Sequence, residues 1–98
     1  MIMKEDIKNV GIDTQSLTYK DNYISGSMYI EYNDSDDFDV LDFSSEFSEN
    51  SLVKSVDFDI SDLYHRNQIS DDAVEAIKEC LKENLETNFG QNLRYLFD

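Results

Sequence analysis

The sequence contains no proline and no tryptophan, and it has only three glycines, one cysteine and one histidine. A single cysteine excludes an internal disulfide and any zinc or redox motif that needs a second cysteine. The lone histidine, His65, stands in a polar stretch without a glycine-built nucleophile turn, so no Ser/His/Asp or Cys/His catalytic site is expected. We therefore expect a protein that is not an enzyme and that uses no cofactor.

Basic residues and long apolar runs are also scarce. Against 22 Asp and Glu there are 8 Lys and Arg, which gives a formal net charge of −14. Such a surface repels nucleic-acid phosphates and anionic lipids, so we expect basic protein partners, no direct nucleic-acid binding and no membrane attachment. No apolar run approaches the roughly 18 residues of a membrane span, and the first residues lack the apolar stretch of a secretory signal. This predicts a cytoplasmic protein.

The apolar content is nevertheless sufficient for a core. Leu, Ile, Val and Phe account for 27 of the 98 residues, which exceeds the roughly 20% below which a highly charged chain is expected to stay unfolded. Six tyrosines add further apolar surface. A chain of this length has room for one core, so we predict a single domain over residues 1–98.

Near the N-terminus the apolar residues fall at helical spacing. Met3, Ile7 and Val10 share one helix face, and Gly11 stands where a left-handed C-terminal cap belongs. A short N-terminal helix is therefore predicted.

From residue 16 the apolar period changes to two. The alternation predicts a β-hairpin with its turn at 20–22, and Gly26 in its second strand indicates a bulge or a close backbone approach. Phe38 and Val40, with acids between them, predict a third strand that Leu41 and Phe43 extend, and residues 44–50 are expected to form a loop. Tyr32 ends the stripe of the second strand that begins at Ile24.

Alternation at Val56 and Phe58 predicts a fourth strand, and Ser70 is a good N-cap for a helix. Gly90 is expected to end this helix, and the apolar tail 93–97 is expected to fold back on the sheet. We predict an α+β fold in which a small antiparallel sheet of three to four strands packs on a C-terminal helix, with a short N-terminal helix. The apolar stripe of the C-terminal helix comprises Val74, Ile77, Leu81 and Leu85.

The acidic run at residues 34–39 raises the question of a calcium site. An EF-hand loop needs oxygen ligands at its first, third and fifth positions, glycine at the sixth and glutamate at the twelfth. If the loop starts at Asp34, these last three positions hold Phe38, Asp39 and Ser45. The pattern fails at all three, so no metal site is predicted, and weak cation binding by this loop stays open.

Negative charge is concentrated in one third of the chain. Residues 31–62 hold eleven acids and one base, Lys54, while the rest of the chain holds eleven acids and seven bases. An ordinary solvated surface intersperses lysine among its acids. Alternate residues of a strand lie about 6.6 to 6.8 Å apart, close to the axial spacing of every second phosphate of a DNA strand. An acidic sheet can therefore imitate a nucleic-acid backbone.

In its size, its charge, its lack of catalytic residues and its Asp-, Ser- and Tyr-rich strands, the chain resembles the small acidic inhibitors of phages and other mobile elements. These are the anti-CRISPR and DNA-mimic proteins. The resemblance covers the whole chain loosely and involves no shared motif. It implies a non-enzymatic inhibitor that binds rows of Lys and Arg on a Cas effector, a restriction enzyme or a related nuclease, in the cytoplasm of a bacterial host.

The candidate partner-binding residues are eight acids of this segment and three tyrosines that can act as aromatic anchors. They are Glu31, Asp34, Asp36, Asp37, Asp39, Asp42, Asp57 and Asp59, with Tyr23, Tyr29 and Tyr32.

Two other functions fit the same composition. One is an immunity or antitoxin protein that neutralises a basic nuclease toxin, and the other is an acidic adaptor module that inhibits nothing. The sequence leaves open whether the protein is a monomer or a homodimer, and whether the tail 95–97 is buried or offered to a partner.

Overall fold

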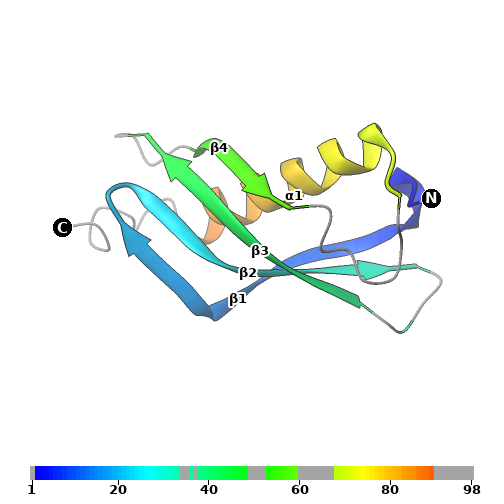
Figure 1. The fold of residues 1–98 in the computed structure, drawn as a ribbon, viewed down its shortest axis with the longest axis horizontal. Coiled ribbons are helices and arrows are strands. Elements are labelled where there is room, and N and C mark those ends of the chain that lie inside the picture. The colour runs from blue at the N-terminus through cyan, green and yellow to red at the C-terminus, as the bar shows by residue number, and fades with distance from the viewer. Residues whose placement is uncertain (1, 34–35, 37, 49–52, 60–67, 90–98) are drawn as a thin grey trace.

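The computed structural model describes residues 2–33, 36, 38–48, 53–59 and 68–89. In chain order its elements are the 3-10 turn η1 (Lys4–Asp6), the strands β1 (Ile7–Lys20), β2 (Tyr23–Tyr32), β3 (Phe38–Phe47) and β4 (Val53–Phe58), and the helix α1 (Asp71–Phe89). The strands form one antiparallel sheet in the order β1-β2-β3-β4, and α1 lies along one face of it (Figure 1). The predicted α+β fold class is confirmed. Within the described ranges no helix combines the length and the apolar composition needed to cross a membrane.

The N-terminal helix is shorter than its apolar spacing predicts. Helical backbone is confined to η1, and Ile7, Val10 and Gly11 belong to β1. Gly11 has no left-handed φ and caps no helix. It lies instead under the ring of Tyr29 on the neighbouring strand, where a β-carbon would collide with that ring. Eight residues form only a marginal helix by themselves, whereas pairing with β2 satisfies their backbone groups in the sheet.

Strands β1 and β2 form the predicted hairpin. Asp21 and Asn22 make its two-residue turn with φ values of 51° and 69°, as a type I′ turn requires. The second half of β1 shifts register against β2 and therefore bulges. The bulge lies over Gly26, where an added β-carbon would stand 2.9 Å from both Ser16 Oγ and Leu17 Cδ2. The predicted close approach at Gly26 is confirmed, and the extra residues are on β1.

Strand β3 is longer than predicted and runs to Phe47 through residues that were expected to form a loop. Phe38 and Val40 are 55% and 56% exposed, because side chains alternate between the two faces of a strand and the other set is buried. Reversing that alternation would expose three large apolar side chains in order to bury two. The buried set is Asp39, Leu41, Phe43, Ser45 and Phe47.

Helix α1 covers the buried face of the sheet. Ser70 is its N-cap, as predicted, since Ser70 Oγ accepts the Ala73 N–H at 3.1 Å. The predicted stripe packs on the sheet, with Val74 half-buried and Ala73 fully buried beside it. The fully buried members of the predicted stripe are Ile77, Leu81 and Leu85. The sheet contributes Val10, Ile24, Met28, Ile30, Tyr32, Leu41, Phe43 and Phe47 to the same core.

The predicted fourth strand is confirmed as far as Phe58, and its Val56 and Phe58 side chains pack at the margin of the core. His65, the predicted cap at Gly90 and the apolar tail lie outside the described residues.

Helix α1 also holds both edge strands of the sheet. Asn84 Nδ2 donates a hydrogen bond of 3.0 Å to the carbonyl of Val10 in β1. Glu86 Oε1 accepts the N–H of Val53 in β4, also at 3.0 Å. An edge strand presents unpaired backbone groups, and these two side chains satisfy one such group on each edge.

A carboxylate is buried on the face of the sheet that packs against the helix. Asp39 is 1% exposed and Tyr32 is 7% exposed, and Tyr32 Oη donates a 2.6 Å hydrogen bond to Asp39 Oδ2. The sequence predicts both as partner-binding residues, whereas the structure buries both side chains. The alternation that buries Leu41 and Phe43 buries Asp39 as well, because all three share one face of β3.

We expect Tyr32→Phe to lower the free energy of unfolding by about 1–3 kcal/mol, because it removes a hydrogen bond from a buried carboxylate. Tyr23→Phe on the same strand is the matched control, since the Tyr23 hydroxyl bonds Glu46 at an exposed site. That variant should change stability far less than Tyr32→Phe does. Urea denaturation of the three proteins measures the difference, and equal stability losses in the two variants would contradict the assignment.

Candidate functional site

The sheet has a second face that α1 does not cover, and we call it the open face. It is the face to which the side chains between the core residues of each strand point. Its members are Asn9, Gly11, Asp13, Thr18 and Lys20 from β1, Tyr23, Ser25, Ser27, Tyr29 and Glu31 from β2, Phe38, Val40, Asp42, Ser44 and Glu46 from β3, and Ser55 and Asp57 from β4.

The strand register arranges these side chains in rows that cross the sheet. Two rows at one end are partly aromatic or apolar: Asn9, Glu31 and Phe38, and then Gly11, Tyr29 and Val40. The central rows contain only acids and small hydroxyl residues: Asp13, Ser27 and Asp42, and then Thr18, Ser25, Ser44 and Asp57. The row at the far end contains Lys20, Tyr23, Glu46 and Ser55. Neighbouring rows lie about 6.7 Å apart and neighbouring strands about 4.8 Å apart.

The central rows present unneutralised carboxylates. Asp42 and Asp57 are exposed and occupy a diagonal position on adjacent strands, which corresponds to about 7–8 Å. Within the described part of the chain, neither of them has a hydrogen-bond or ion-pair partner. Asp13 is exposed and lies across Ser27 from Asp42. The serines between these acids are small, so the carboxylates stand clear of their neighbours.

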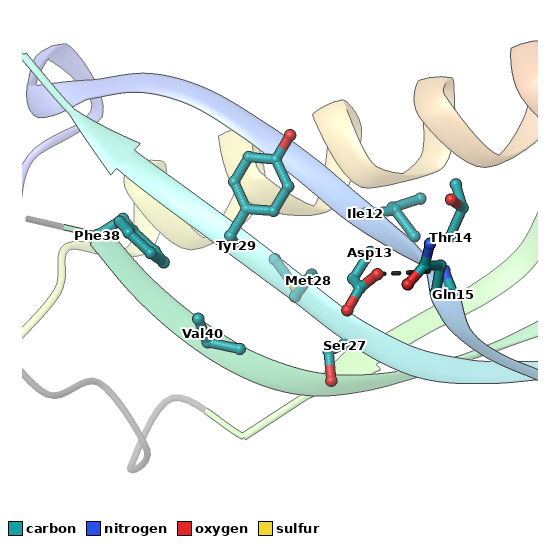
Figure 2. A pocket seen from close by; sticks show the side chains of 9 residues that line it. All are labelled: Ile12, Asp13, Thr14, Gln15, Ser27, Met28, Tyr29, Phe38 and Val40. Carbon is teal, nitrogen blue, oxygen red and sulfur yellow. Dashed lines mark hydrogen bonds between the residues drawn. The ribbon is translucent and has the colours of Figure 1, made fainter.

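Aromatic and apolar side chains cover the end of the open face next to the Asp13 row. The ring of Tyr29 reaches across β1 above Gly11, and Phe38 and Val40 stand beside it on β3 (Figure 2). Together with Asp13 and Ser27 these side chains line a shallow hollow of about 490 Å³. Asp13 is held in place because its Oδ1 atom accepts the Gln15 N–H at 3.1 Å.

At the opposite end of the open face a small polar network forms. Tyr23 Oη donates a 2.9 Å hydrogen bond to Glu46 Oε1, and Lys54 Nζ lies 3.6 Å from Glu46 Oε2. The hydrogen bond to Glu46, together with the negative charges of Glu46 and Asp57, raises the pKa of the Tyr23 phenol above its usual value. Lys54 partly neutralises this end, so the strongest uncompensated negative charge lies in the central rows.

The predicted partner-binding residues fall into four groups. Five lie on the open face: Tyr23, Tyr29, Glu31, Asp42 and Asp57. Two exposed acids, Asp36 and Asp59, lie beyond strand ends. Tyr32 and Asp39 are inside the protein. Asp34 and Asp37 lie outside the described residues.

Sequence reasoning missed Asp13, Phe38 and Val40 as members of this surface. A signal for Asp13 is present, since Val10 and Ile12 alternate with smaller or polar residues, which is a strand period. The helical spacing of the N-terminal residues concealed it. Phe38 and Val40 are apolar, and only the burial of the other face of β3 shows that they are exposed.

The outer side of α1 is a second acidic surface. Four exposed acids follow one another at a spacing of four residues: Asp71, Glu75, Glu79 and Glu83. Like charges at this spacing repel each other. The side chains of Lys78 and Lys82 lie half-buried beside this row and reduce its net charge. Unlike the open face, this surface carries no aromatic side chain in its row.

Within the described ranges, no three His, Cys, Asp or Glu side chains converge closely enough to hold a metal ion. Comparison with protein-family models, with curated proteins and with solved structures found no match for this chain.

Glu46→Gln should lower the pKa of Tyr23 toward its usual value of about 10, because it removes the charged acceptor of the Tyr23 hydroxyl. The near-ultraviolet absorbance of tyrosinate, followed against pH, measures this, and the difference from Tyr23→Phe isolates Tyr23 from the other tyrosines. Since the folded-state pKa is raised, the contact stabilises the fold at neutral pH, and this stabilisation is lost as pH rises through that pKa. An unchanged Tyr23 titration in Glu46→Gln would contradict the assignment.

Proposed function

We propose that this protein is a non-enzymatic inhibitor of the anti-CRISPR or DNA-mimic type, which blocks the basic nucleic-acid-binding surface of a host defence complex or nuclease. The observation that carries the proposal is the open face, a sheet surface that α1 does not cover and whose central rows, in the described residues, hold only acids and small hydroxyl residues. A surface that binds a phosphate backbone presents Lys and Arg in a similar repeat. Such a partner lies in the bacterial cytoplasm, where we propose that this protein acts.

The spacing of the carboxylates supports imitation of a phosphate backbone. Neighbouring rows of the open face are separated by about 6.7 Å along the strands, and every second phosphate of a DNA strand advances by about 6.8 Å. Asp42 and Asp57 stand in successive rows, and Asp13 extends the first of these rows across the sheet. The hydrogen-bonded strands hold these positions rigidly, which reduces the entropy lost when a partner binds.

The open face is a better contact surface than the outer side of α1. In the part of the chain that the structure describes, no basic side chain lies among its central acids, whereas Lys78 and Lys82 accompany the acids of the helix. It also carries exposed Phe38, Val40 and Tyr23. Aromatic side chains that are desolvated on binding supply most of the energy of many interfaces. The charge of the whole protein would mainly accelerate the encounter with a basic partner.

An immunity protein that neutralises a basic nuclease toxin is the second candidate. The same central acids favour it, because a nuclease also exposes Lys and Arg where its substrate binds. Identification of the bound enzyme separates the two functions. The first test is capture from a bacterial lysate at low and at high salt, with competition by the DNA or RNA of the captured enzyme.

The proposal predicts that Asp42→Lys with Asp57→Lys weakens binding to the captured enzyme by about 100-fold or more, because like charges then face each other in the contact. Glu75→Lys with Glu79→Lys is the matched control, since it makes the same change of charge at exposed positions of α1. The control should weaken binding by less than about tenfold, through the loss of long-range attraction alone. Surface plasmon resonance and an enzyme inhibition assay measure both pairs.

Equal losses in the two double variants would show that only net charge matters and would overturn the open face as the contact. Capture that is indifferent to salt and to nucleic acid would favour an adaptor module instead. Circular dichroism of each variant verifies that the fold persists. This is the expected result, because the four substituted positions are exposed and have no partner among the described residues.

A further inference from the structure

The hollow at the aromatic end of the open face combines two features that rarely occur together on a solvated surface. One is exposed apolar area, since Phe38 and Val40 are each more than half exposed next to the ring of Tyr29. The other is a carboxylate, because Asp13 lines the same hollow (Figure 2). The charged and aromatic parts belong to adjacent rows of the sheet, so they are separated by about 6.7 Å.

This combination determines which kind of group fits. A purely apolar side chain would cover the Asp13 carboxylate without giving it a partner, which is unfavourable. A second copy of this protein would bring two open faces together, and each of them carries Asp13, Asp42 and Asp57. Charge complementarity therefore requires a cation, and the aromatic lining requires a cation that packs well on a ring.

Arginine meets both requirements better than lysine does. Its guanidinium is planar and weakly hydrated, stacks on aromatic faces and pairs with carboxylates through two parallel hydrogen bonds. A cation is attracted to a ring within about 6 Å of the ring centre. A guanidinium paired with Asp13 can therefore also reach the ring in the next row. The lysine ammonium is a compact, strongly hydrated ion that gains less from the rings.

We propose that this hollow binds an arginine side chain of the partner protein, with Asp13 as the anionic ligand and Tyr29, Phe38 and Val40 as the packing surface. The inference rests on the proposed function and assigns a second role within the open face. The central rows attract basic side chains of either type, while the hollow selects arginine. The partner would accordingly place an arginine at one end of its row of basic residues.

The test uses two synthetic hexapeptides of equal charge, one alternating glycine with arginine and the other alternating glycine with lysine. Each is titrated into the isotope-labelled full-length protein, and amide chemical shifts give the affinity and the location. We expect the arginine peptide to bind about two- to fivefold more tightly. Its largest shifts are expected at Gly11, Tyr29 and Val40.

Tyr29→Ser combined with Phe38→Ser removes both rings of the hollow and should abolish the preference for arginine while both peptides still bind the central acids. Tyr23→Ser is the matched control, because it removes an exposed aromatic side chain from the other end of the same face, where Lys54 accompanies Glu46. It should leave the preference unchanged. The Asp13→Asn variant should lower the affinity for the arginine peptide more than that for the lysine peptide.

Equal affinities of the two peptides for the unmodified protein would overturn the arginine site and leave the acidic contact face standing. A preference that survives Tyr29→Ser with Phe38→Ser, or that disappears with Tyr23→Ser, would overturn it as well. Failure of both peptides to bind would remove the open face as a contact and the arginine site with it. Self-association at high concentration, with shifts centred on Phe38 and Val40, would identify a second copy as the occupant and would overturn the proposal.

Discussion

The packing of one helix against one face of a four-stranded sheet is the contact on which the rest of this structure depends. The buried stripe of α1, which includes Ile77, Leu81 and Leu85, meets the apolar side chains of β2 and β3 in a single core. Each large side chain in such a core contributes about 1.5–3 kcal/mol relative to exposure. Since one helix shields only one face, most side chains on the other face of the strands remain at least partly exposed. The open face is a direct consequence of this one-sided core.

The same constraint explains the unusual distribution of polar and apolar groups. In β3 the burial of Leu41, Phe43 and Phe47 forces Asp39 inward, where Tyr32 donates a hydrogen bond to it. It also forces Phe38 and Val40 outward. A buried carboxylate and exposed apolar side chains each lower the stability of the fold. The fold tolerates both because burying the three large core residues of β3 contributes more free energy than these two features cost. At the open face these exposed side chains adjoin the acidic rows, where a partner can make use of both.

Negative charge lies on both sides of the core, along the outer side of α1 and over the centre of the open face. Repulsion within each surface lowers stability and raises solubility. The two surfaces differ in rigidity and chemistry, however. The helix presents long side chains accompanied by Lys78 and Lys82, whereas the open face presents short Asp and Ser side chains on a hydrogen-bonded sheet whose edges α1 holds through Asn84 and Glu86. A fixed array of short acids suits recognition of a fixed array of cations.

The sequence by itself determined the fold class, the hairpin turn, the Gly26 contact and the helix that begins after Ser70, because each depends on local periodicity or on a local backbone requirement. It also determined that the surface is acidic, since composition alone sets the net charge. Only the tertiary structure decided that residues 7–11 extend a strand, because pairing with β2 outweighs a marginal local helix. It likewise decided which acids face water. Both faces of β3 carry apolar residues. Which face is buried depends on where α1 packs, and the sequence of the strand alone does not indicate this.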